Sequence, residues 1–370
     1  MKTSTHSVIA LSLSIAANIA VGQDLNKFEN ESPLTIGFRK QLFVDDFIIS
    51  RRSGITRELG QVTEANEGRP LLVVDKPWEV FGCFSYGTVL HDENKFRMWY
   101  MAGGEYLVAY AESEDGLNWT KPCLGLFDSE EKLGPYSIKP EQRRPIDLAG
   151  GENNLVGLFG DGFTCFLDPH ETDPAHKYKA AHGNQQYIKA CLSHSPDGVH
   201  WFPYNNGEPV TARASDTYNQ LLWDEDAKTY RLYTRTDFGT INGVELRGNR
   251  GMTNPDIKVD PTNWTTIRNW KFDREGPEEG LRRQIYGLTD WIYEGVHFGL
   301  MHVFEYADDH SEGDCDLVKR HERDVSNYYI APSRDGDSWD LSWVYASKPI
   351  VPRGPDGSFD KDSIMHTSQI

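Results

Sequence analysis

Four similar hairpin-like segments recur along the chain, and this repetition constrains the fold more than any other feature of the sequence. In each segment an apolar stretch ends at an acidic turn, and a stretch rich in aromatic and basic residues follows it. Alternation of apolar and polar residues on both sides of such a turn indicates a β-hairpin. The segments are 85–104, 164–183, 217–236 and 286–305, with turn acids at Asp92, Asp168, Asp224 and Glu294.

A seven-residue pattern, Ser-x-Asp-Gly-x-x-Trp, follows three of these hairpins. It occurs at 113–119, 195–201 and 333–339, each time after a third apolar stretch, and we expect its Trp to open a fourth strand. The third hairpin lacks a clear copy, and "DPTNW" at 260–264 is interpreted as a degenerate remnant. Four strands per unit at intervals of roughly 40–75 residues are typical of propeller blades. Helical periodicity is weak throughout, so we predict an all-β fold, a five-bladed β-propeller of four-stranded antiparallel blades.

The repeated pattern itself is expected to be structural. Asp-Gly favours a tight turn, because Asp caps its own backbone and Gly accepts a positive φ, while the Ser can bond the turn amides. The Trp can pack between neighbouring sheets. The functional alternative is sugar stacking on Trp119, Trp201 and Trp339, but a residue repeated in every blade is seldom part of a unique site.

The two ends of the sequence set the expected domain organisation. "GSFDKDSIMHTSQI" at 357–370 begins a fifth unit, after which the sequence stops, so we expect the last blade to be incomplete at the C-terminus. The alternative, a blade completed by "QLFVDDFIIS" at 41–50, supplies one strand where three are needed. Lys2, an apolar run and small residues up to Gly22 indicate a secretory signal peptide. The prediction is a signal peptide at 1–22, a linker at 23–40 and the propeller at 41–370.

The net charge limits the partners of the chain, and the cysteine spacing limits its disulfides. The net charge of -18 argues against nucleic acid or an anionic membrane surface as the main partner. Beyond the signal peptide no apolar stretch is long enough to span a membrane, so we expect a secreted or periplasmic protein, taken to be a monomer. The 5 cysteines form no C-x-x-C pair, which favours buried free thiols with at most one or two disulfides.

Several segments are distinctive enough to suggest a family: "LFVDDFII", "KPWEVFGCFSYGTVLHDENKFRMWYMAG", "YAESEDGLNWTKPCLGL", "DTYNQLLWDEDAKTYRLYTR" and "GSFDKDSIM". They resemble secreted bacterial proteins, common in planctomycetes, that are grouped with the five-bladed propeller glycosidases of the invertase, levansucrase and arabinanase superfamily (glycoside hydrolase families 32 and 43). The resemblance runs from about Gln41 to the C-terminus. It implies an axial pocket whose carboxylates cleave glycosidic bonds in a poly- or oligosaccharide.

Glycoside hydrolysis needs one carboxyl group to protonate the leaving oxygen and another to attack or to activate water. The resemblance implies a mid-chain acid, and "ARASDTYN" offers Asp216 at the start of the third inner strand. Asp216 is therefore the first catalytic candidate, with Arg213 and Asn219 as substrate-binding neighbours. A turn-capping Asp is the structural alternative.

The first inner strand departs from the family pattern, because "CFSYGTVL" contains no carboxylate. Glu79, just before it, is the replacement candidate, with Trp78 as a sugar platform. Asp360, at an inner-strand position of the fifth unit, is the third catalytic candidate. The remaining candidates are substrate-binding: Tyr86, Tyr286 and Asp290.

Other functions remain open at this point. A carbohydrate-binding propeller without catalysis and a glycoside phosphorylase, with Arg213 or Arg235 on phosphate, are the alternatives; a sialidase is less favoured because its Asp–Gly spacing differs. No cofactor is expected, since no phosphate loop, dinucleotide fingerprint or zinc motif is present. The acidic stretch 307–316 could hold Ca²⁺, although it matches no EF-hand loop and a solvated loop is the default.

Overall fold

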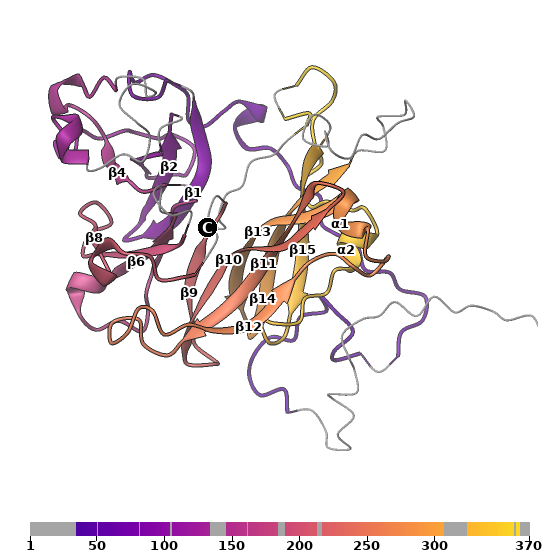
Figure 1. Ribbon diagram of the computed structural model, residues 1–370. Helices are drawn as coiled ribbons and strands as arrows, with labels where there is room; N and C mark the ends of the chain where they lie inside the picture. The colour runs from indigo at the N-terminus through magenta and orange to yellow at the C-terminus, as the bar shows by residue number, and fades with distance from the viewer. Residues whose placement is uncertain are drawn as a thin grey trace, which may run out of the picture.

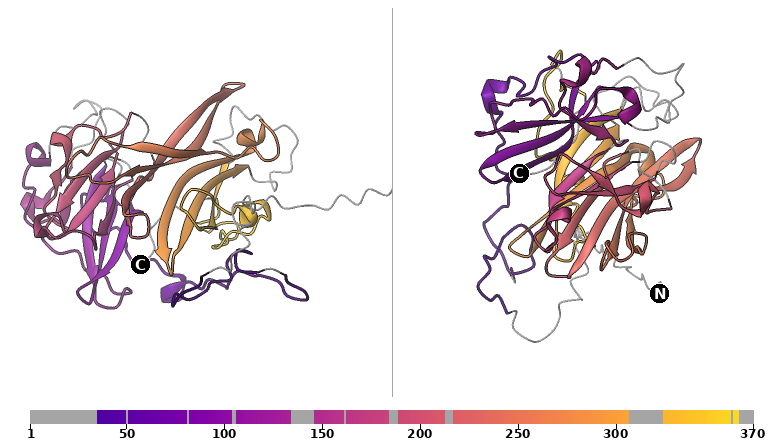
Figure 2. Two further views of the ribbon diagram at one scale, coloured as in Figure 1. Left: turned by 90° about the horizontal axis from the view of Figure 1, so that it is seen from below. Right: turned by 90° about the vertical axis from the view of Figure 1, so that its left-hand side faces the viewer.

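The computed structural model describes residues 35–49, 51–80, 82–103, 106–133, 146–160, 162–183, 189–212, 217–306, 324–358 and 360–362. Within them the chain forms antiparallel sheets of a β-propeller, which we call blades A to D in chain order (Figure 1). Sheets A and B lie on one side of the molecule and sheets C and D on the other (Figures 1 and 2). The prediction of an all-β propeller of antiparallel blades is confirmed, with four strands in each of blades A to C and three in the described part of blade D.

The strands of each blade follow one another in sequence. Blade A contains β1 (Cys83–Asp92), β2 (Lys95–Ala102), β3 (Leu107–Ser113) and β4 (Leu155–Leu158). Blade B contains β5 (Thr164–Leu167), β6 (Tyr178–His182), β7 (Cys191–Ser195) and β8 (Phe202–Pro203). Blade C contains β9 (Gln220–Asp224), β10 (Thr229–Ile241), β11 (Val244–Asn254) and β12 (Thr265–Trp270). Blade D contains β13 (Arg283–Tyr293), β14 (Val296–Tyr306) and β15 (Asp324–Ser333).

Helical structure in the described residues is limited to short turns. Two α-helical turns, α1 (Glu279–Arg282) and α2 (Ser342–Tyr345), flank blade D. The 3-10 turns are η2 (Ala65–Gly68), η3 (Glu130–Leu133), η5 (Ala149–Gly151), η6 (Pro174–His176) and η7 (Asn205–Gly207). None of the described helices is long and apolar enough to cross a membrane.

The first strand of each blade is the innermost one. β1 lies next to β5, β5 next to β9, and β9 next to β13. All four predicted hairpins are present, as β1–β2, β5–β6, β9–β10 and β13–β14. Their register places the N-terminal ends of all four inner strands at one end of the propeller, which we call the axial end, and the turn acids at the other.

Three expectations about the strands are wrong or only partly confirmed. The structure describes four sheets; the expected fifth is not among the described residues. Residues 41–49 form turns and bends and no strand. The fourth strand of blade A begins at Leu155 and not at Trp119, because the chain first runs through a long loop whose described part includes η3 and η5.

The core consists of apolar layers between neighbouring blades. Trp99 and Tyr110 of blade A pack with Phe163 and Tyr178 of blade B. Tyr233 of blade C packs against the Leu288, Met301 and Trp339 cluster of blade D. Alternate side chains point to opposite faces of each strand, so blades covered on both sides need apolar residues on both faces. This explains why the inner strands read as nearly continuous apolar runs.

The Ser-x-Asp-Gly-x-x-Trp pattern forms the same turn in all three copies. In blade B, Ser195 Oγ accepts hydrogen bonds from the amides of Asp197 (3.3 Å) and Gly198 (2.8 Å). Asp197 Oδ1 accepts from the amides of Val199 (2.9 Å) and His200 (2.8 Å). The copies in blades A and D repeat these bonds. The structural interpretation is therefore confirmed.

The degenerate copy in blade C keeps two features of the turn. Asp260 Oδ1 accepts from the Thr262 amide at 2.9 Å, as Asp197 Oδ1 accepts from that of Val199. Trp264 Nε1 donates to the backbone oxygen of Pro261 at 2.8 Å, as Trp201 Nε1 donates to that of Gly198 at 2.9 Å. The indole thus closes the turn even where Ser and Gly are missing. The interpretation of 260–264 as a remnant is confirmed by this bond.

A segment before blade A fastens the turns of blades C and D. Arg39 pairs with Asp226 in the β9–β10 turn at 2.5 Å. Asp45 accepts two hydrogen bonds from Arg334, both 2.8 Å, and is 5% exposed. These contacts lie at the turn end of the propeller, so Asp45 is remote from the axial end.

Candidate functional site

The axial ends of the inner strands meet around one tyrosine. Tyr218, just before β9, is 1% exposed, and its hydroxyl donates to the backbone oxygen of Gly87 on β1 at 2.9 Å. A Cβ atom added to Gly162 would lie 2.7 Å from Tyr218 Cα, and one added to Gly287 would lie 3.3 Å from Tyr218 Cβ. A side chain at position 162 or 287 would crowd Tyr218, so the two glycines let Tyr218 approach blades B and D. Together with the bond to Gly87 on blade A, Tyr218 of blade C thus contacts all four blades.

Aromatic and hydroxyl groups continue this cluster toward the surface. The Tyr86 ring lies 5.8 Å from that of Tyr218. Tyr286, which is half-buried, lies 4.3 Å from Phe304 and 5.1 Å from His302. His302 stacks on Tyr328 at 4.5 Å. Tyr286 is partly exposed, whereas Tyr86, His302 and Tyr328 are buried. A partly exposed ring with hydrogen-bonding groups nearby is suited to polar ligands with apolar faces.

His302 is neutral at physiological pH. Burial lowers its pKa to about 3, because the charged imidazolium would be desolvated. Its Nε2 is hydrogen-bonded to Ser326 Oγ, and both groups are fully buried. The pair therefore acts as an uncharged hydrogen-bonding element and offers no accessible nucleophile.

Glu79 lies at this end of blade A but is sealed inside it. It is 0% exposed, and Oε2 accepts from the amides of Asp75 (3.0 Å) and Lys76 (3.1 Å). Tyr100 donates to Oε1 at 2.6 Å, and Lys121 lies 2.7 Å from the same oxygen. The hydrogen bonds from Lys121 and Tyr100 outweigh burial and hold the pKa of Glu79 below its usual value. This arrangement fixes the segment before β1 and gives Glu79 a structural role.

Two predicted substrate-binding residues are also buried. Trp78 is 3% exposed and donates from Nε1 to Asn154 at 2.9 Å, inside the core of blade A. Asn219 is 0% exposed, donates to the Thr217 backbone and accepts from Thr234 Oγ1 at 2.7 Å. Neither side chain forms a platform open to solvent.

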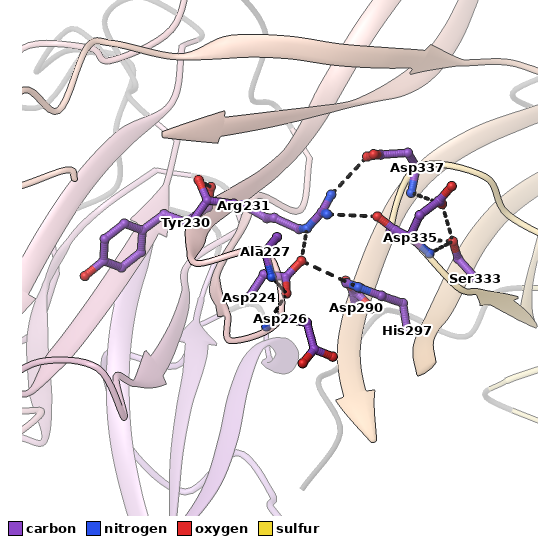
Figure 3. Close-up of polar contacts among 12 residues, drawn as sticks. Asp224, Asp226, Ala227, Tyr230, Arg231, Asp290, His297, Ser333, Asp335 and Asp337 are labelled. Atoms are coloured by element: carbon purple, nitrogen blue, oxygen red, sulfur yellow. Dashed lines mark hydrogen bonds and ion pairs between the residues drawn. The ribbon is translucent and has the colours of Figure 1, made fainter. Parts of the chain in front are cut away.

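Asp290 lies toward the opposite end, between blades C and D (Figure 3). Its carboxylate accepts from Tyr233 at 3.0 Å and is bonded to His297 Nδ1 at 2.7 Å. The strand carrying Asp290 is 11 residues long, and Asp290 pairs with Gly299, near the turn of the hairpin. The structure thus separates Asp290 from Tyr286, although both belong to β13.

Some of the remaining predicted residues lie outside the part of the chain that the structure describes. Arg213 and Asp216 lie outside the described residues, and so does the acidic stretch 307–316 considered for Ca²⁺. Asp360 is partly exposed; its backbone oxygen accepts from Gly354 at 3.3 Å, and nearby Asp362 pairs through its backbone with Ser326 at the axial end of β15. Within the described ranges, no group of three His, Cys, Asp or Glu side chains is arranged to hold a metal ion.

Two further acids belong to the axial end, where sequence reasoning did not place them. Glu305, at the end of β14, pairs with Arg283 (3.1 Å) and accepts from Asn327 (2.8 Å) and Tyr329 (2.5 Å). Asp237, on the extension of β10, accepts from Arg235 at 3.0 Å. Both are on second strands, and only the register with the inner strand reveals their position.

The four cysteines that the structure describes are free thiols: Cys83, Cys123, Cys165 and Cys191. Cys165 and Cys191 are buried, as expected, whereas Cys123 is exposed. Burial raises the pKa of the Cys83 thiol to about 12. Because a thiol with a raised pKa stays protonated at neutral pH, Cys83 is not suited to act as a nucleophile.

The fold and the axial cluster define an all-β propeller of four-stranded blades. No protein-family model matches the chain, and no curated protein does. Among solved structures, it is similar to a thermostable family-43 glycoside hydrolase (14% identity, TM-score 0.42, 68% of this chain and 69% of that one). It is also similar to a β-fructofuranosidase from Schwanniomyces occidentalis (13%, 0.41, 70% and 44%) and an N-acetylgalactosamine deacetylase from F. plautii (16%, 0.42, 72% and 69%).

These likenesses are distant, and the chain spans less than half of the fructofuranosidase. At such identities and TM-scores they do not establish an activity for this chain. Membership of the glycosidase superfamily therefore stays a prediction from the sequence.

Proposed function

We propose that this chain is a glycoside hydrolase-like propeller that binds a poly- or oligosaccharide at its axial end. The observation that carries this proposal is the convergence of four blades on Tyr218, with the half-buried Tyr286 packed against the buried His302 and the buried Tyr86 packed against Tyr218. Sugars present apolar faces edged by hydroxyl groups, which suit aromatic rings with nearby hydrogen-bonding groups. The resemblance of the quoted segments supports the same class.

The proposed catalytic pair is Asp216 and Glu305. Asp216 directly precedes Thr217 and Tyr218 in the sequence, and Tyr218 lies at the axial end. Glu305 replaces Glu79 as its partner, because Glu79 has no exposed surface and its oxygens are already held by four donor groups. Asp360 stays a predicted third acid on the same side of blade D.

Release of reducing sugar from plant and algal glycans would test this proposal. With a responsive glycan, Asp216→Asn is expected to lower kcat at least ~100-fold, the usual contribution of one acid–base group, with an unchanged melting temperature. Glu305→Gln is expected to act similarly, whereas Glu79→Gln should lower stability and leave the kcat of the folded fraction unchanged. Undiminished hydrolysis by Asp216→Asn would show that the assignment is wrong.

A carbohydrate-binding propeller without catalysis is the second candidate. It is favoured by β1, whose only carboxylate, Asp92, lies at the turn end, and by the sealed Glu79. Binding of a glycan that is never cleaved, weakened by Tyr286→Ala, would support it. A phosphorylase is less favoured, because Arg235 is already paired with Asp237 (3.0 Å) and Glu245 (2.8 Å); phosphate-dependent turnover would establish it nevertheless.

We also propose a fifth blade beside blade D. His297 and Met301 of β14 face blade C, so Phe298 and Leu300 face the other way, and the Phe298 ring stacks on Trp291 at 5.4 Å. These side chains are only partly buried, as expected for a face that another sheet would complete. Phe298→Ser should lower stability by ~3 kcal/mol if this face is covered and by little if it is open.

Secretion is the last part of the proposal. Residues 1–22 lie outside the described residues, so the signal peptide rests on the sequence pattern alone. N-terminal sequencing of protein recovered from outside the producing cells should begin at or near Gln23. Recovery of an intact Met1 only inside the cells would contradict secretion.

A further inference from the structure

An equivalent position shortly after the hairpin turn is occupied by tyrosine in blades B and C and by histidine in blade D. The residues at this position are Tyr178, Tyr230 and His297. They pair across their own hairpins with Leu167, Trp223 and Ile292, respectively. Each also reaches the turn acid of the preceding blade. Tyr178 donates to Asp92, and Tyr230 donates to Asp168 at 2.8 Å. His297 Nε2 lies 3.6 Å from Asp224 Oδ2.

His297 differs from the tyrosines in having two nitrogens that both face carboxylates. Nδ1 lies 2.7 Å from Asp290 Oδ2 within blade D, while Nε2 faces Asp224 of blade C (Figure 3). A neutral imidazole carries one proton, so one nitrogen lone pair would then face a carboxylate. Only the imidazolium makes both contacts favourable, and His297 is 5% exposed, so water cannot substitute readily.

The carboxylates around His297 also favour a second positive charge beside Arg231. Arg231 pairs with Asp224 at 2.6 Å and with Asp337 at 2.9 Å. The charged and titratable groups near His297 are Asp224 on β9, Asp226 in the next turn, Arg231 and Tyr233 on β10, Asp290 on β13 and Asp337 after β15. Asp335 contributes its backbone oxygen, which accepts from Arg231 at 2.8 Å. Asp226 is itself paired with Arg39. The carboxylates of Asp224 and Asp337 therefore share Arg231, while the carboxylate of Asp290 pairs with His297.

The imidazole ring is closely packed. A Cβ added to Gly336, the turn glycine of blade D, would lie 2.9 Å from His297 Cε1 and 2.9 Å from the Arg231 guanidinium. Trp339 meets the imidazole edge-on at 6.3 Å. The ring is thus held in the orientation that presents Nε2 to blade C.

We propose that His297 is a proton-operated lock between blades C and D. With a proton on each nitrogen it bridges Asp224 and Asp290; loss of the Nε2 proton removes the attractive contact with Asp224 and weakens the junction. The hydrogen bond and charge of Asp290 offset burial and raise the pKa of His297 above its ordinary value, in agreement with this geometry. The other two junctions, with tyrosines, have no proton to lose near neutral pH.

The sign of the pH effect follows from the raised pKa. The stabilising contribution is complete below the unfolded pKa of about 6.5 and disappears as the pH rises through the higher folded value. Melting temperatures of the wild type and His297→Tyr are to be compared from pH 6 to 9 at constant ionic strength. His297→Tyr installs the residue found at the other junctions and should abolish the pH-dependent part.

The wild type is expected to lose at least about 2 °C more than His297→Tyr over this range. His182→Gln is the matched control: His182 is also buried, but burial lowers its pKa to about 4, and its hydrogen bonds go to backbone oxygens and Ser193. Its curve should run parallel to that of the wild type. Parallel curves of melting temperature against pH for the wild type and His297→Tyr would overturn the proposal.

A second measurement decides the question even if His297→Tyr does not fold. The imidazole carbons of the wild-type protein are followed by NMR, with His297 assigned from the missing signal of His297→Gln or by backbone correlation. A titration midpoint above 6.5 is expected, and a midpoint at or below 6.5 would overturn the proposal. Neither experiment depends on catalysis, so the result stands or falls separately from the proposed glycosidase function.

Discussion

The indole Nε1 of Trp99 donates to the backbone oxygen of Gly198 at 2.7 Å, which joins the second strand of blade A to the turn of blade B. The corresponding position on β10 is Tyr233, whose hydroxyl donates to Gly336 at 3.2 Å in blade D. The repeated turn is therefore a docking element between blades, in addition to closing its own loop. This relationship leads to predictions that compare equivalent copies.

Gly198→Ala is expected to be more destabilising than Gly116→Ala. Both glycines have positive φ angles (81° and 74°), so both alanines are strained by roughly 1 kcal/mol. The added Cβ at 198 would lie 2.7 Å from Trp99 Cζ2, whereas at 116 its nearest neighbour is Phe96 at 3.5 Å. Chemical denaturation should show an extra loss of ~1–3 kcal/mol for Gly198→Ala. Equal losses would mean that the blade contact is looser than described.

Trp99→Phe is expected to lower stability by ~1–3 kcal/mol. The substitution removes the N–H donor and part of the ring, while Gly198 retains the bond from Trp201 at 2.9 Å. Trp99→Ala should lower the free energy of unfolding by ~3–5 kcal/mol, because Trp99 is 0% exposed between the two blades. Urea unfolding of the two variants measures the difference.

Lys179→Met is expected to lower stability by ~3–5 kcal/mol at pH 7. The ammonium group is 0% exposed and lies 2.6 Å from Asp168 and 2.8 Å from Glu171, so its removal takes the buried cation away from both carboxylates. Lys177→Met, at a partly exposed cation two residues earlier, serves as the matched control and should cost less. Similar losses for both variants would contradict a special role of burial.

Glu171 should contribute to acid unfolding. Hydrogen bonds from Lys179 and the Asp173 amide outweigh burial and lower its pKa to about 2. A depressed folded pKa gives stability that is present above the unfolded value of about 4.3 and is lost as the pH falls toward 2. Glu171→Gln should therefore unfold with a shallower pH dependence between pH 5 and 2. An unchanged slope, followed by circular dichroism, would argue that Glu171 is not perturbed.

Local patterns were sufficient to predict the hairpins and the repeated turn. β3 (Leu107–Ser113) is the apolar stretch expected before the first copy of the repeated turn, and the Ser, Asp and Gly of each turn bond as their chemistry requires. These features depend on neighbours within a few residues, which is why sequence alone specifies them. The error at 41–50 has the same origin: alternation predicted a strand, but a strand needs a partner that this segment lacks among the described residues.

Exposure and the gathering of distant side chains were decided by the tertiary structure. Glu79 looked like an available carboxylate until Lys121, from beyond the blade A turn, and Tyr100 closed over it. Asp290 and Tyr286 are neighbours on one strand, yet the register places them toward opposite ends of the blade. His297 acquires two carboxylate partners only because blades C and D pack together. Sequence periodicity determined which residues share a strand; the packing of one blade on the next determined which of them water or a ligand can reach.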